Sequence, residues 1–134
     1  GCCLVSRTSA TLAVNERETI THNHSTETLM NKQHEQERAA VNSAVLKLQR
    51  NGWRVLAVDD GEEMEDIDQG LSTTRQRKAA VNAADATDWA KIYLKSSNSD
   101  RAELFIVWGN TAECVISDIT ASSEAVLDQV EALI

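Results

Sequence analysis

The sequence is most informative in what it lacks. It contains no proline, which excludes proline-rich linkers and leaves five glycines as the main breaks between elements. No apolar run approaches the roughly 20 residues that span a bilayer, and no polybasic stretch is present. The first residues do not show the charged, apolar and small-residue order of a secretory signal. We therefore expect one soluble domain in the cytoplasm and no membrane partner.

Residues that build catalytic and metal sites are scarce. The three cysteines are Cys2, Cys3 and Cys114, and none has the C-x-x-C or Cys/His spacing of a metal site. The three histidines all lie at or before His34, far along the chain from Cys114. No G-x-S-x-G, glycine-rich phosphate loop or H-E-x-x-H occurs. We predict no catalytic residues, no metal ligands and no cofactor, which leaves open whether the protein is an enzyme.

The pattern of the chain changes near Met30. Residues 1–29 are rich in Thr, Ser, Asn and Glu and have no sustained apolar period. Such a stretch cannot bury enough apolar surface to offset the entropy lost on ordering. Residues 30–134 are strongly patterned. The sequence therefore predicts a poorly structured N-terminal extension over 1–29 and a single domain over 30–134.

The apolar spacing in residues 30–134 predicts a mixed fold. Val41, Val45 and Leu48 recur at helical spacing, and Gly52 suits the left-handed residue that ends a helix. We predict helices over 31–50, over 73–84 and from Ser122 or Ser123 onward, and strands over 53–58, 89–95, 104–108 and 113–119. Short connections make the last three strands antiparallel neighbours. We expect an α+β fold of order α-β-α-β-β-β-α, whose four-stranded, mainly antiparallel sheet has helices mainly on one face.

The net charge of −8 is concentrated in one short segment. The rest of the chain is nearly neutral. Seven carboxylates lie within ten residues: Asp59, Asp60, Glu62, Glu63, Glu65, Asp66 and Asp68. Asp60 and Glu63 form an acidic version of the capping box. Met64, Ile67 and Leu71 have the i, i+3 and i+7 spacing of one helical stripe. The segment is therefore predicted to be a short acidic helix.

Three interpretations of the acidic segment are open. Clustered carboxylates offer the oxygen ligands that Ca²⁺ or Mg²⁺ prefer, but Val58 and Leu56 stand where an EF-hand loop would need ligands. A second interpretation is a surface that binds a basic protein partner or imitates DNA phosphates. A third is a solvated helix whose acids interact with their own helix dipole. We assign a partner-binding acidic surface to Asp60, Glu62, Glu63, Glu65 and Asp66.

Basic residues do not form a nucleic-acid-binding face. The only basic cluster is Arg75, Arg77 and Lys78. A nucleic-acid-binding domain usually presents a wider basic patch. We therefore do not expect nucleic acid to be a partner, and this cluster is the one place where it would bind.

Apolar residues on the strands raise the question of a second subunit. If Trp53, Phe105 or Val107 lies on the sheet face away from the helices, that face needs cover. A second copy of the chain would supply it, so the sequence allows a homodimer.

Three stretches in the C-terminal half resemble small uncharacterised proteins of bacterial plasmids, phages and integron gene cassettes. They are Ala84-Asp-Ala-Thr-Asp88, Phe105-Ile-Val-Trp-Gly-Asn110 and Glu113-Cys-Val-Ile-Ser-Asp118. The resemblance covers about the last 50 residues and implies an origin in a bacterial mobile element. It implies no activity. We therefore expect a non-enzymatic accessory protein that binds a protein partner through its acidic surface. The alternative is a small enzyme or ligand-binding protein with a pocket between the sheet and the acidic helix.

Overall fold

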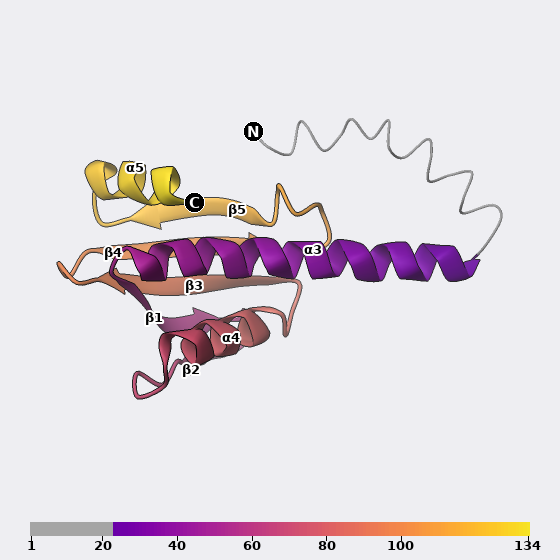
Figure 1. The fold of residues 1–134 in the computed structure, drawn as a ribbon, viewed down its shortest axis with the longest axis horizontal. Helices are drawn as coiled ribbons and strands as arrows, with labels where there is room; N and C mark the ends of the chain where they lie inside the picture. Colours follow the sequence, from indigo (N-terminus) through magenta and orange to yellow (C-terminus); the bar gives the residue numbers. More distant parts are fainter. Residues whose placement is uncertain (1–22) are drawn as a thin grey trace.

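The computed structural model describes residues 23–134 (Figure 1). Side chains are described from Lys32 onward. The helices are α3 (Asn23–Arg50), α4 (Thr73–Ala84) and α5 (Glu124–Leu133). The strands are β1 (Trp53–Asp59), β2 (Met64–Asp66), β3 (Trp89–Ser96), β4 (Arg101–Val107) and β5 (Ile116–Ala121). Cys2, Cys3 and most of the extension expected over 1–29 lie outside the described residues. The α+β class is confirmed.

The sheet has five strands in the order β2-β1-β3-β4-β5, and every neighbouring pair is antiparallel. The expected four-stranded sheet is therefore wrong by one strand, because β2 adds an edge next to β1. The other strands follow the predicted order. β4 begins at Arg101 rather than at Leu104, since Lys95 pairs with Arg101 across the turn. β5 begins at Ile116, after a turn closed by the bond from Cys114 N to Thr111 O.

The alternation of side chains places the core on one face of the sheet. In β3 Ala90, Ile92 and Leu94 are fully buried, whereas Lys91 and Tyr93 between them are only half-buried. In β4 Ala102, Leu104 and Ile106 are buried in the same way. All three helices contact strands from this side. The expectation of helices mainly on one face is confirmed, and we call the opposite side of the sheet the open face.

Helix α3 packs along the sheet through the predicted stripe. Val41, Val45 and Leu48 are fully buried. The helix ends at Arg50, and Gly52 has a φ of +90°, as expected for the residue after a helix. It begins at Asn23 rather than at residue 31, and its first turns project beyond the sheet (Figure 1). Among residues 23–134, no helix is both long and apolar enough to cross a membrane.

The acidic segment is a hairpin and not a helix. After β1 the chain turns at Asp60 and returns as β2, whose residues pair with Ala57, Val58 and Asp59. Of the predicted stripe only Ile67 is buried, and Met64 is exposed. Backbone pairing with β1 outweighs the weak helical pattern here, and Gly61 allows the turn with a φ of +94°.

The later helices begin close to where the sequence predicts. Ser72 rather than Thr73 caps α4, accepting a hydrogen bond from Arg75 N at 3.3 Å. Ser123 caps α5 and accepts from Val126 N at 3.2 Å. Trp53 is buried with the helix-side core, so it does not lie on the open face, whereas Phe105 and Val107 are half-buried there.

A buried glutamate joins α3 to the loop between β4 and β5. The Glu37 side chain is 1% exposed, and its Oε1 accepts hydrogen bonds from Gly109 N at 2.9 Å and Asn110 N at 3.2 Å. The Gln33 amide donates to the carbonyl of Asn110. Glu37 therefore fixes the start of this loop against the helix layer.

Glu37→Ala is expected to lower the free energy of unfolding by about 1–3 kcal/mol, because two backbone N–H groups lose their buried acceptor. Exposed Glu35, two residues earlier on α3, supplies the control, and Glu35→Ala should change stability by about 0.5 kcal/mol or less. Urea denaturation of both variants measures the difference. Equal stability of the two would contradict the role given to Glu37.

Candidate functional site

The acidic hairpin, which we define as Asp59–Asp68, is held by its own backbone. Asp60 N donates to Glu63 O at 3.1 Å, which closes the turn. The Asp60 carboxylate accepts from Glu63 N at 2.8 Å and from Glu62 N at 2.9 Å. These bonds lower the pKa of Asp60, because they stabilise its ionised form. The predicted capping role of Asp60 is therefore fulfilled in a turn rather than at a helix end.

The tip of the acidic hairpin rests on the start of β3. A Cβ at Gly61 would lie 2.9 Å from Cζ2 of Trp89, so only glycine fits without a shift. The Thr87 hydroxyl donates to the carbonyl of Asp60 at 2.5 Å. The hairpin is therefore positioned by Trp89 and Thr87, from a segment far along the chain.

Two large apolar side chains are exposed at the acidic hairpin. Met64 is 56% exposed and Trp89 is 37% exposed, and within residues 32–134 no other large hydrophobic side chain is exposed to this extent. Met64 is in β2, and Trp89 packs against the hairpin tip. Met64 and Trp89 therefore add apolar surface beside the carboxylates of the hairpin.

Of the predicted partner-binding residues, Glu62, Glu63, Glu65 and Asp66 are exposed and Asp60 is half-buried, and the five do not form one flat surface. Asp60, Glu62 and Glu63 lie in the turn, whereas Glu65 and Asp66 lie in β2. Glu65 pairs with Val58 and Asp66 with Ala57, so their side chains point to opposite sides of the sheet. Within the described residues, no three His, Cys, Asp or Glu side chains are grouped to hold a metal ion.

The open face continues from the acidic hairpin across the sheet. The rings of Trp89 and Phe105 meet edge to face with centroids 5.7 Å apart. Lys91 Nζ lies 6.0 Å from the centre of the Phe105 ring and 3.5 Å from Glu103 Oε1. The open face therefore carries aromatic contacts near the hairpin and charged contacts further along β3 and β4.

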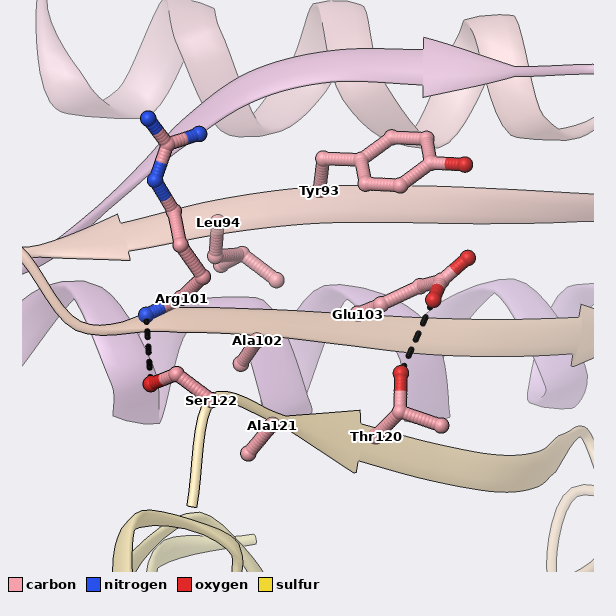
Figure 2. Close-up of a pocket in the computed structure, with 8 residues that line it drawn as sticks. All are labelled: Tyr93, Leu94, Arg101, Ala102, Glu103, Thr120, Ala121 and Ser122. Atoms are coloured by element: carbon pink, nitrogen blue, oxygen red, sulfur yellow. Dashed lines mark hydrogen bonds between the residues drawn. The ribbon is translucent and has the colours of Figure 1, made fainter.

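The far part of the open face is hollowed by a depression of about 330 Å³ (Figure 2). It is lined by Tyr93, Leu94, Arg101, Ala102, Glu103, Thr120, Ala121 and Ser122. Thr120 Oγ1 donates to Glu103 Oε2 at 2.8 Å, and Arg101 N donates to Ser122 Oγ at 3.2 Å. The Arg101 guanidinium reaches away from Glu103 toward β1, so these two charges do not pair. The polar groups of this depression serve mainly cross-strand bonds.

Tyr93 has a perturbed ionisation on this face. Partial burial raises its pKa, and the charge of Glu103 and a hydrogen bond to that carboxylate raise it further. Asp59 contributes in the same direction. These effects favour the neutral form of the phenol.

A charged cluster that the sequence did not predict joins α3 to the end of α4. His34 Nε2 lies 2.8 Å from Asp85 Oδ1, and Arg38 Nη1 lies 2.5 Å from Asp85 Oδ2. Arg38 Nη2 donates to Asn82 Oδ1 at 2.6 Å, and the His34 ring lies 5.3 Å from that of Trp108. The i, i+4 spacing of His34 and Arg38 was a signal that both share one helix face. Their shared partner, Asp85, lies 47 or more residues further along the chain, and the spacing of His34 and Arg38 does not indicate it.

Comparison of the chain with protein families, curated proteins and solved structures found no match. The resemblance to mobile-element proteins therefore stays a prediction. Any functional inference rests on the geometry described above.

Gly61→Ala is expected to destabilise the protein more than Gly109→Ala. Both glycines have a φ of +94°, so each variant incurs a left-handed backbone cost of roughly 1–2 kcal/mol. Only the Gly61 variant also meets the Trp89 ring, whereas a Cβ at Gly109 meets nothing within 4 Å. That contact should add about 1 kcal/mol or more. Denaturation of the two variants compares them, and equal losses would show that Trp89 does not confine the hairpin tip.

The tyrosine titration is a second test of this surface. The chain has one tyrosine, so tyrosinate absorbance in a pH titration reports Tyr93 alone. Its midpoint should lie above 10.0, and Glu103→Gln should lower it toward 10.0 by removing the charge. Because the folded pKa is raised, this contribution to stability is complete below the unfolded pKa and is lost as pH rises through the folded value. Glu113→Gln, which alters an exposed acid outside the lining, should leave the midpoint unchanged.

Proposed function

We propose that the protein is a non-enzymatic binding protein that docks a basic segment of a protein partner on its acidic hairpin. One observation supports this most: the two exposed large apolar side chains, Met64 and Trp89, lie at the segment that contains seven carboxylates. A site of this kind combines an apolar centre with a charged surround.

The two parts of the site have different roles in binding. Burial of Met64 and Trp89 under a partner supplies free energy, at about 25 cal/mol for each Å² removed from water. The carboxylates attract a basic segment and reject an acidic one, which gives rate and specificity more than affinity. Because the site holds −7 of the net charge of −8, its field is local to the hairpin.

The edge position of β2 adds a third contribution. β2 is the first strand of the sheet order, and β1 is its neighbour on one side only. A partner segment that extends along β2 would form backbone hydrogen bonds with its outer edge. Its lysine or arginine side chains would then meet Glu65 on one side and Asp66 on the other.

The alternative function, a small enzyme or ligand-binding protein with a pocket between the sheet and the acidic helix, stays a prediction, although the acidic segment is a hairpin and not a helix. The acidic residues form a hairpin, and the depression of about 330 Å³ lies on the open face, away from the helices. A cytoplasmic location and a mobile-element origin remain part of the proposal, supported by the resemblance of the C-terminal half. A second copy covering the open face also stays a prediction, and a monomer in sedimentation at micromolar concentration would remove it.

Neutralising the acidic hairpin should abolish partner binding. In a variant with Glu62→Gln, Glu63→Gln, Glu65→Gln and Asp66→Asn, capture of the partner from a bacterial lysate should fall by tenfold or more, and capture by the unchanged chain should weaken as salt rises. Quantitative mass spectrometry of the captured proteins measures both. The single substitution Met64→Ala should weaken capture by about fivefold, because the apolar contact with the partner is lost.

The matched control removes the same charge elsewhere. A variant with Glu35→Gln, Glu113→Gln, Asp128→Asn and Glu131→Gln neutralises four exposed acids outside the hairpin. It should capture the same proteins as the unchanged chain. If both variants lose the partner equally, net charge and not the acidic hairpin is responsible, and the proposal is wrong.

A further inference from the structure

A groove between α3 and α4 gathers positive charge in an acidic protein. Its volume is about 350 Å³. Its polar and charged lining consists of Arg38 and Asn42 of α3 with Thr74, Arg77, Lys78 and Asn82 of α4. The lining holds three cations and no carboxylate, although the chain has a net charge of −8.

Two of these cations have no ion-pair partner in the described part of the chain. Asp85 pairs with Arg38 at 2.5 Å, and no carboxylate lies within 4.0 Å of Arg77 or Lys78 there. Arg77 is nevertheless held in place by neutral groups. Its Nε donates to Asn42 Oδ1 at 3.0 Å, and its Nη1 donates to Gln49 Oε1 at 2.8 Å. A fixed but uncompensated guanidinium is suited to an external anion.

The neighbouring amides are arranged to donate as well. Asn42 uses its side-chain oxygen to accept from Arg77, and Asn82 uses its own to accept from Arg38 at 2.6 Å. Each amide therefore keeps its N–H groups for another partner. With Arg77 Nη2, the Lys78 ammonium and the Thr74 hydroxyl, the groove offers donors and no unused carboxylate.

We propose that this groove binds the phosphate group of a compact anionic ligand. Guanidinium, ammonium and amide donors match the oxygens of a phosphate. The volume lies within the range of about 300–1,000 Å³ typical of small-molecule sites. A long polyanion is a poorer fit, because the basic lining is short and the same chain contains the strongly acidic hairpin. This site is separate from the acidic hairpin and does not rest on the function proposed for it.

The test is an NMR titration of the full chain with inorganic phosphate, with adenosine monophosphate and with a single-stranded oligonucleotide. Phosphate and the nucleotide at roughly millimolar concentration should shift the Nε–H signal of Arg77 and the side-chain amides of Asn42 and Asn82. Lys78→Gln should weaken binding roughly three- to tenfold, since it removes a charge-assisted hydrogen bond. Lys78 makes no hydrogen bond or ion pair within the described residues, so its loss leaves the fold intact.

Two further variants make the result decisive. Asn82→Asp keeps the acceptor for Arg38 and adds a negative charge to the groove, so binding should be lost. Lys95→Gln removes a cation from the open face, on the other side of the sheet, and binding should be unchanged. Absence of shifts in the groove, or equal weakening by Lys78→Gln and Lys95→Gln, would overturn the proposal. Tighter binding of the oligonucleotide than of the nucleotide would overturn the assignment to a compact ligand.

Discussion

Burial of one face of the sheet is the constraint on which the rest of the molecule depends. The alternation in β3 and β4 directs Ile92, Leu94 and Leu104 toward the helices. With one face covered, every polar or charged strand residue must lie on the open face or at an edge. The position of the acidic hairpin fits this arrangement. It extends the sheet at the β1 edge, where its carboxylates can stay in contact with solvent.

Negative and positive charge gather at two different places in the protein, the acidic hairpin and the groove between α3 and α4. In the hairpin, carboxylates share a short strand and turn whose backbone pairs with β1. In the groove, Arg77 is held by the amide oxygens of Asn42 and Gln49, so its charge is left unpaired. The sequence shows Arg77 and Lys78 as part of its one basic cluster, but it does not show that Arg38 of α3 lines the same groove. We propose that the first surface binds a basic partner and that the second binds an anion.

The sequence predicts the elements whose period is set by burial and fails where other forces decide. The stripe of Val41, Val45 and Leu48 and the alternation of β3 both follow from contact with one core, and both are confirmed. The acidic segment has a weak helical stripe, but part of it forms a strand because it pairs with β1. No local sequence pattern indicates that pairing. The five acidic residues of the candidate site could be named in advance because charge is visible in a sequence, and their role in binding stays a prediction. The contacts of Trp89 with Gly61 and of Arg77 with Asn42 were not predicted, because they join segments that are distant in the sequence.

The central claim is that a protein partner docks on the acidic hairpin and its two apolar side chains. Hydrogen–deuterium exchange of the full chain, alone and with the partner captured from a lysate, tests this directly. The account predicts slower exchange over Asp59–Asp68 and at the start of β3 in the complex, with little change along β5 and α5. Protection confined to β5, α5 or the far part of the open face would contradict it.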